Sequence, residues 1–206
     1  MVIKMNRVFV SLGPINIYWY SVLIISAILI GIHFSGKVAE KNGLGKTTLL
    51  DLIFGLIFIG VVGARLYYVI FNFSIFKDDL ISIFKVWEGG LAIYGAVIAG
   101  ILYLIYYSKK YNQNIYLILD TLIPYLLLGQ AIGRWGNFIN QEAHGAITTY
   151  EHLKSMHLPD FIINGMYING SYYIPTFLYE SVWCLIGFII LLIVRKKDNF
   201  NHKGLL

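Results

Sequence analysis

Long apolar stretches dominate this sequence and restrict the folds that are open to it. Five of them are long enough to cross about 30 Å of hydrocarbon as helices. They cover residues 17–35, 51–72, 90–107, 115–133 and 176–194. Only 13% of the residues are charged, against roughly 25% in soluble domains, which is too few to cover a water-facing surface. The sequence therefore predicts an all-α, polytopic membrane helix bundle of about five spans.

The longest stretch without such a span is residues 134–175. It is rich in aromatic and aliphatic residues, and it contains two short β-prone runs, Tyr167-Ile168 and Tyr172-Tyr173. That composition is typical of folded rather than disordered chain. We expect residues 1–206 to form a single transmembrane domain, with residues 134–175 as a small extracytoplasmic cap within it.

The charges between the apolar stretches predict the orientation in the membrane. Lysine and arginine exceed the acids in residues 36–50, in residues 108–114 and in the tail after residue 194. Acids match or exceed them in residues 73–89 and 134–175. Because basic loops stay on the cytoplasmic side, the predicted cap faces outward. The net charge of +5 is divided among these loops, which does not favour a nucleic-acid partner.

A few ionisable and tyrosine side chains fall inside or beside the predicted spans, where charge is costly and usually functional. They are Arg65, Asp120, Arg134, Glu180, Tyr20 and Tyr94. All but Asp120 are expected near the outer ends of spans, where two arginines could bind an anion such as a phospholipid phosphate. The alternatives stay open: Arg65 could pair structurally with Glu180, and the tyrosines could be interfacial aromatics.

The polar cluster from residue 133 to residue 145 is the strongest local signal. It places an arginine, two carboxamides and a carboxylate close together at the end of a predicted span, at Arg134, Asn137, Asn140 and Glu142, followed by His144 and Gly145. A helix-ending cap is one reading, and an anion or lipid site is the other. A second stretch, residues 87–95, holds Gly89, Gly90 and Gly95. Its glycines permit tight helix packing or leave space beside Tyr94 for a lipid.

Cys184 is the only cysteine. It excludes an internal disulfide and any multi-cysteine metal site. Inside an apolar stretch it is expected to be a buried small hydrophobe rather than a nucleophile. No metal site is predicted.

The motif Gly-Arg-x-Gly-Asn-Phe-x-Asn-x-Glu-x-x-Gly at residues 133–145 resembles the signature of prolipoprotein diacylglyceryl transferases. Other matches to this family occur in order along the chain. They are Gly13-Pro14 before Trp19-Tyr20, Gly63 to Tyr68, Trp87 to Leu91, Asp120 to Pro124, and Pro175 to Ser181. Several ordered motifs are far more specific than any one of them.

The resemblance implies a reaction and its partners. Members of the family transfer the diacylglyceryl group of phosphatidylglycerol to the lipobox cysteine of a preprolipoprotein, at the outer face of the bacterial cytoplasmic membrane. The thiol attacks the sn-3 glycerol carbon and glycerol phosphate leaves. This step needs a cation on the leaving phosphate and a route for the thiol proton. The implied partners are the phospholipid, the lipobox segment and the bilayer, with no cofactor.

The resemblance also assigns roles to residues. Arg134 would hold the phosphate, Asn137 and Glu142 would complete the catalytic set, and Tyr94 would stand where many members have histidine. The substrate-binding set is then Arg134, Tyr20, Arg65, Asn140, Gly145 and Glu180. A tyrosine hydroxyl is a poor base near neutral pH, so Glu142 or His144 becomes a candidate for proton removal.

Tyrosine at position 94 is one departure from many family members, and a second lies at the C-terminus. The family continues past the equivalent of Leu206 into another span that carries a second functional arginine and an acid. We therefore expect a fragment or a shortened member, and a non-catalytic lipid- or lipoprotein-binding relative is the alternative function. Intramembrane charge alone would also suit a transporter or channel subunit, but the broken half-helices common in transporters are missing from the pattern.

Overall fold

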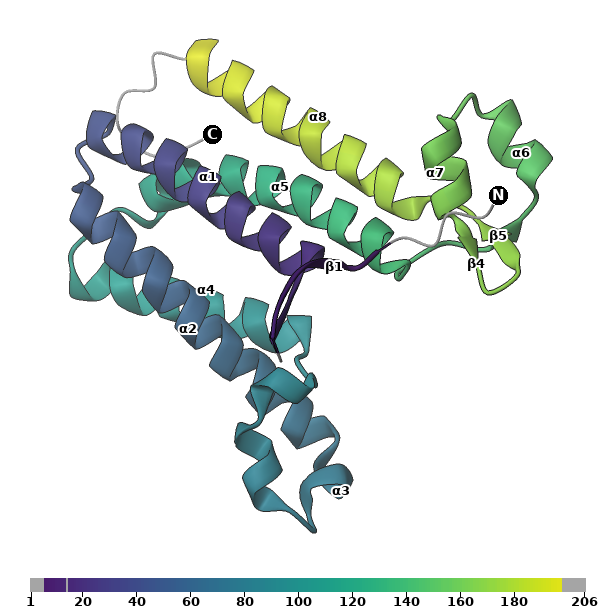
Figure 1. Ribbon diagram of the computed structural model, residues 1–206. Coiled ribbons are helices and arrows are strands. Elements are labelled where there is room, and N and C mark those ends of the chain that lie inside the picture. Colours follow the sequence, from purple (N-terminus) through teal and green to yellow (C-terminus); the bar gives the residue numbers. More distant parts are fainter. Residues whose placement is uncertain (1–5, 14, 198–206) are drawn as a thin grey trace. The chain divides into compact units, whose positions relative to one another are not determined.

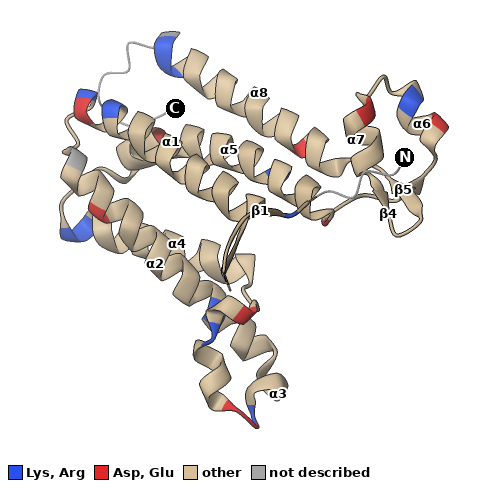
Figure 2. Ribbon diagram, viewed as in Figure 1, with Lys and Arg blue, Asp and Glu red and all other residues tan. Residues whose placement is uncertain are grey.

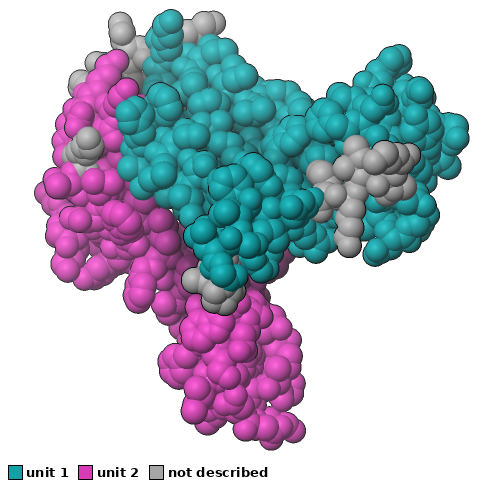
Figure 3. Space-filling model, in the orientation of Figure 1, with its two compact units in different colours: residues 1–35, 121–200, 206 teal, residues 36–120, 201–205 magenta. Residues whose placement is uncertain are grey.

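The computed structural model describes residues 6–13 and 15–197. The described residues do not include Pro14, the charged residues of the tail beyond residue 197, or Leu206, on which the expectation of a fragment or shortened member rests. The chain divides into two compact units, shown in Figure 3. The first unit holds residues 1–35, 121–200 and 206, and the second holds residues 36–120 and 201–205. The single transmembrane domain stays a prediction.

Four helices of the described chain are long and apolar enough to cross a membrane. They are α1 (Trp19–Lys41), α2 (Lys46–Phe71), α5 (Ile115–Asn140) and α8 (Thr176–Lys197). Figure 2 shows them free of charged residues along most of their length, with charges mainly near their ends. The polytopic helical class is thus confirmed.

The remaining predicted span, residues 90–107, corresponds to α4 (Ile93–Lys110). This helix is shorter than the four, and its last turn holds Lys109 and Lys110. It is not among the helices that length and composition alone qualify to cross a membrane. A total of five spans therefore stays a prediction.

In the first unit, α1 and α5 (both labelled in Figure 1) pack antiparallel along a face of small residues on α5. The space between the α5 glycines and the α1 side chains decreases toward the C-terminal end of α5. A Cβ atom at Gly129 would lie 4.0 Å from Ala27 Cβ, one at Gly133 would lie 3.4 Å from Ile24 Cδ1, and one at Gly136 would lie 2.5 Å from Tyr20 Cδ2. Small residues of this kind let helices approach closely within a membrane.

On its opposite face, α5 packs against α8, which also runs antiparallel to it. The Ser181 hydroxyl donates a hydrogen bond of 2.9 Å to the Ala131 carbonyl, and Cys184 Sγ lies 3.6 Å from Gln130 Oε1. Cys184 was expected to be buried, but it is only half-buried in the structure. The reason is its place on the side of α8 that faces Gln130 rather than within a packed core.

Two small antiparallel sheets accompany the helices of the first unit. The hairpin of β1 (Val8–Leu12) and β2 (Ile15–Tyr18) leads directly into α1. The second sheet has the order β3 (Ile147–Thr148), β5 (Ser171–Tyr173), β4 (Tyr167–Ile168). The two predicted β-prone runs form β4 and β5, whereas the hairpin was not predicted.

The segment between α5 and α8 is compact. It contains the short helices α6 (Tyr150–Ser155) and α7 (Asp160–Gly165) in addition to the second sheet. Its buried cluster consists of Phe138, Leu153, Ile162, Ile163, Met166 and Phe177. Because Phe138 belongs to α5 and Phe177 to α8, this core fixes the facing ends of the two helices. The position of the segment outside the membrane stays a prediction.

In the second unit, α2 and α4 cross at glycines. A Cβ atom added to Gly95 would overlap the Gly63 carbonyl oxygen, and one added to Gly63 would overlap Ala99. The tight-packing reading of Gly95 is therefore confirmed. The connection between the helices is made of α3 (Phe73–Phe76) and the 3₁₀ helices η1 (Leu80–Phe84) and η2 (Val86–Glu88).

Gly63→Ala is expected to lower the free energy of unfolding by about 1–3 kcal/mol, the usual cost of overpacking. The new methyl group would meet Ala99 and the backbone of Gly95, which cannot move aside cheaply. Gly60→Ala is the matched control on the same helix, because a Cβ there meets no atom within 4 Å and alanine favours the helix by up to about 1 kcal/mol. Thermal unfolding in detergent micelles measures both. Equal melting temperatures for the two variants would contradict this packing.

Candidate functional site

Arg134 lies inside α5, because this helix continues to Asn140 rather than ending near residue 133. The extension has a packing cause. Phe138 is buried and stacks on Phe177 of α8 with ring centroids 4.5 Å apart, so the last turns of α5 have an apolar partner. The first half of the polar signature is consequently helical, and Arg134 and Asn137 project from adjacent turns of α5.

The end of α5 is a Schellman motif, in which a residue with positive φ closes the helix. The amide of Gln141 donates to the Phe138 carbonyl, and the amide of Glu142 donates to the Asn137 carbonyl, both at 3.0 Å. Gln141 has φ 55°, a conformation usually left to glycine. Its side chain donates to the Gly165 carbonyl at 3.1 Å, which ties the helix end to α7.

The chain reversal after α5 brings Asn140 and Glu142 together. Asn140 Nδ2 donates a 3.0 Å hydrogen bond to Glu142 Oε1. The Glu142 side chain is exposed and its carboxylate is held in one orientation by the carboxamide. A carboxylate fixed in this way can accept a proton or a hydrogen bond from a ligand.

The end of the signature is fastened to the start of α8. Gly145 donates its amide to the Ile174 carbonyl at 2.9 Å, and the Thr176 hydroxyl donates to the Ala143 carbonyl at 2.9 Å. A Cβ atom at Gly145 would lie 2.9 Å from Thr176 Cγ2. Gly145 is thus a close-approach position, and its contacts set where α8 begins.

That placement of α8 puts Glu180 opposite Arg134. Nη2 of Arg134 and Oε2 of Glu180 form an ion pair, and the two side chains keep 38% and 45% of their surface exposed. A pair this exposed contributes only about 0–1 kcal/mol to stability. The alternative pairing of Glu180 with Arg65 is wrong, because Glu180 engages the arginine that faces it across the α5–α8 contact.

Tyr20 lies on the other side of α5 from α8. It is the second residue of α1, and its ring rests on Gly136, where any side chain would collide with it. Tyr20 is 38% exposed as a whole residue, so a ligand can reach it.

A shallow, open hollow with room for about one water molecule lies beside the signature, between α5 and the compact segment. Its lining residues are Asn137, Phe138, Gln141, Glu142, Ala143, His144, Met166, Ile168 and Phe177. Its lining combines polar residues of the signature with apolar side chains.

The first unit gathers seven of the nine predicted site residues. They are Arg134, Asn137, Asn140, Glu142, Gly145, Glu180 and Tyr20, which lie at the joined ends of α1, α5 and α8. The other two, Arg65 and Tyr94, belong to the second unit. Arg65 is 7% exposed and Tyr94 is 69% exposed, and the Tyr94 ring lies 6.3 Å from that of Tyr67.

Three residues that support this site were not predicted individually. Each donates a side-chain hydrogen bond to a distant backbone carbonyl. The carbonyl lies 24 residues away in the chain for Gln141, 33 for Thr176 and 50 for Ser181. Such distant partners leave no local pattern in the sequence. Thr176 and Ser181 do fall within the quoted motif from Pro175 to Ser181, which was the available signal.

Comparison with known proteins gives a consistent result. The family described as prolipoprotein diacylglyceryl transferase matches residues 7–206. The phosphatidylglycerol–prolipoprotein diacylglyceryl transferase of Halalkalibacterium halodurans is 47% identical over 96% of this chain and 68% of its own length. Its namesake in Listeria monocytogenes is 48% identical over 93% of this chain and 69% of its own length. The namesake in Ligilactobacillus salivarius is 42% identical over 97% of this chain and 74% of its own length. This chain belongs to the prolipoprotein diacylglyceryl transferase family.

Proposed function

We propose that this protein is an enzyme that transfers the diacylglyceryl group of phosphatidylglycerol to the lipobox cysteine thiol of prolipoproteins. The product is a thioether, and glycerol phosphate is released. The family match over residues 7–206 supports this reaction, as do the names of relatives that share almost half of the sequence. The observation that carries it is the ordered polar cluster around Arg134, built from the family signature at the ends of three helices.

Arg134 is proposed to stabilise the leaving group. As the thiol sulfur bonds to the sn-3 carbon, the carbon–oxygen bond breaks and its electron pair stays on the phosphate oxygen. A guanidinium group offers several N–H donors and a fixed positive charge to that oxygen. Donors aimed at developing charge are usually the largest single contribution to catalysis. The ion pair with Glu180 orients Arg134 while leaving it partly exposed to a ligand.

The thiol proton needs an acceptor, and our candidates are the two titratable side chains that line the hollow, Glu142 and His144. Glu142 has its carboxylate held by Asn140, and His144 lines the same hollow. We propose Glu142 as the acceptor, because its orientation is fixed. Asn137 would bind the lipid near Arg134, and Tyr20 and Tyr94 are further proposed substrate contacts.

The protein is a multi-pass membrane protein, and we place its site at the outer face of the bacterial cytoplasmic membrane. The alternation of basic and balanced loops supports this orientation. In a Cys184→Ser background, Lys154→Cys is expected to react with a membrane-impermeant maleimide in intact cells. Lys41→Cys, exposed but on a predicted inner loop, should react only after lysis. The reverse pattern would overturn the orientation.

The reaction itself is tested with phosphatidylglycerol that carries one label in the diacylglycerol part and another in the head group. The first label should move to the cysteine of a lipobox peptide, and the second should appear as glycerol phosphate. Cys184→Ser is expected to keep full activity, because the nucleophile comes from the substrate. Loss of transfer in Cys184→Ser would instead indicate a covalent intermediate on this chain and contradict the proposal.

A further inference from the structure

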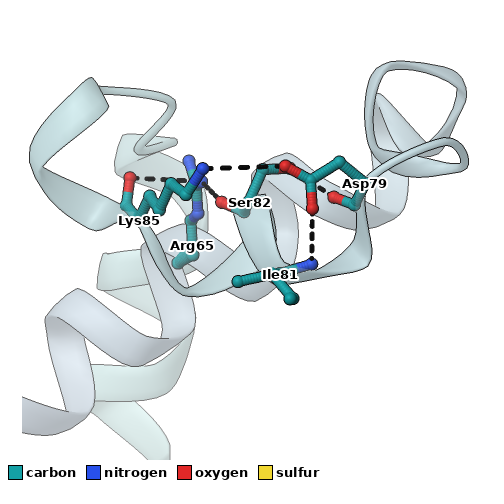
Figure 4. Close-up of polar contacts among 5 residues, drawn as sticks. All are labelled: Arg65, Asp79, Ile81, Ser82 and Lys85. Carbon is teal, nitrogen blue, oxygen red and sulfur yellow. Dashed lines mark hydrogen bonds and ion pairs between the residues drawn. The ribbon is translucent and has the colours of Figure 1, made fainter.

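Arg65 in the middle of the second unit has an unusual environment for a charged side chain. It is 7% exposed, and no ion pair of the described residues includes it. The nearby acid Asp79 pairs with Lys85 instead, at 3.6 Å (Figure 4). A buried charge without a counter-ion needs hydrogen bonds for all of its donors. Arginine has five N–H donors, and they are held in a rigid planar fork.

Backbone carbonyls supply these hydrogen bonds. All of them belong to residues 82–90, named here the carbonyl arc. Nε donates to Ile83 at 2.8 Å, Nη1 to Gly89 and Gly90 at 2.6 and 3.0 Å, and Nη2 to Ser82 and Lys85 at 2.6 and 3.4 Å. Arg65 therefore has as many carbonyl acceptors as donors, and no N–H remains for a phosphate.

The carbonyl arc leads directly into α4. Gly89 and Gly90 have φ of 91° and 72°, a region that side chains disfavour, and a Cβ atom at Gly90 would lie 2.5 Å from Nη1 of Arg65. The residue before Arg65 adds a further tie, since the Ala64 carbonyl accepts from the Ala92 amide at 3.1 Å. Tyr94, two residues later, is held at the start of α4 with its ring exposed.

We propose that Arg65 is a positioning residue for the transfer reaction, acting through the carbonyl arc to hold Tyr94 in place. This inference rests on the proposed function, in which Tyr94 contacts the substrate. It replaces direct phosphate binding by Arg65 with an indirect role. One guanidinium group ties together five carbonyls that would otherwise be free to move, so small changes at Arg65 reach Tyr94.

Kinetics of Arg65→Lys separate the two roles. Lysine keeps the charge but offers only three donors from a single point, so part of the carbonyl arc is released. The kcat is expected to fall about ten- to a hundredfold, as for other misplaced groups. A raised KM with normal kcat would show direct phosphate binding and overturn the proposal. In a Tyr94→Phe background the same substitution should add little, whereas multiplying losses would contradict action through Tyr94.

Hydrogen exchange provides a readout that does not depend on activity. Arg65→Lys should speed amide exchange in residues 82–94 and leave α5 and α8 unchanged. Unchanged exchange in residues 82–94 would refute the proposal even if transfer is lost. Absence of transfer in the unmodified protein would instead count against the proposed function. If Arg65→Lys does not fold, Gly90→Ala replaces it, with Gly100→Ala as control, because a Cβ there lies 3.9 Å from its nearest neighbour.

Discussion

Arg134→Ala is expected to reduce diacylglyceryl transfer by about 100- to 1,000-fold, the usual loss when one group that stabilises a transition-state charge is removed. The reason is that the leaving phosphate would lose its cation. The fold should survive, because the ion pair with Glu180 is partly exposed and such pairs contribute about 0–1 kcal/mol. Initial rates with labelled phosphatidylglycerol and a lipobox peptide measure the effect, and the melting temperature shows that the protein is intact.

Glu180→Gln is the matched control for Arg134→Ala, because it breaks the same ion pair and keeps the cation. A glutamine carbonyl can still accept a hydrogen bond from the guanidinium group, so activity within about fivefold of the unmodified protein is expected, as for other exposed pairs. If Glu180→Gln loses as much activity as Arg134→Ala, the pair rather than the charge matters. Full activity of Arg134→Ala would refute the role given to Arg134.

Gly136→Ala is expected to lower kcat/KM by about 100-fold, a loss that a misplacement of 1 Å can cause. A Cβ atom at this position would lie 2.5 Å from Cδ2 and 3.1 Å from Cε2 of Tyr20, so the ring has to move. The ring base is also close, with Cγ at 3.4 Å, and a simple rotation of the side chain does not relieve the collision. Steady-state kinetics with varied phosphatidylglycerol measure the change.

Gly129→Ala is the control for Gly136→Ala. Both glycines lie on the face of α5 that packs against α1, but a Cβ at Gly129 would be 4.0 Å from its neighbour Ala27, an ordinary contact. This variant should keep its activity and gain helix stability of up to about 1 kcal/mol. Equal activity of the two variants would mean that the position of Tyr20 does not matter for transfer.

The helical architecture could be predicted from the sequence because a membrane span needs only a long apolar run. Residues 115–133 illustrate the limit of that reasoning. The apolar run ends at the polar signature, yet α5 continues to Asn140 because Phe138 packs on Phe177. That contact joins residues far apart in the chain, and no local pattern announces it. The hairpin of β1 and β2 was missed because its strands lie in a short stretch just before the first span.

The sequence identified the residues of the candidate site better than it identified the contacts between them. The signature identified Arg134, Asn137 and Glu142 by residue type and order alone. The partner of Arg134 was not identified, because Glu180 reaches it only through the contacts that Gly145 and Thr176 make at the start of α8. The sequence indicates that a charged Arg65 inside a span is energetically costly. Its role depends on hydrogen bonds to five carbonyls, whose positions follow from backbone conformation.

Diacylglyceryl transfer by this protein is measured by the mass of a lipobox peptide after incubation with the purified protein and phosphatidylglycerol of one acyl composition. The peptide should gain the mass of one diacylglyceryl group on its cysteine, with an equal amount of glycerol phosphate released. A peptide with serine in place of that cysteine should gain nothing. An unchanged cysteine peptide, or transfer of a fatty acyl chain instead of the diacylglyceryl group, would show that the protein does not catalyse this reaction.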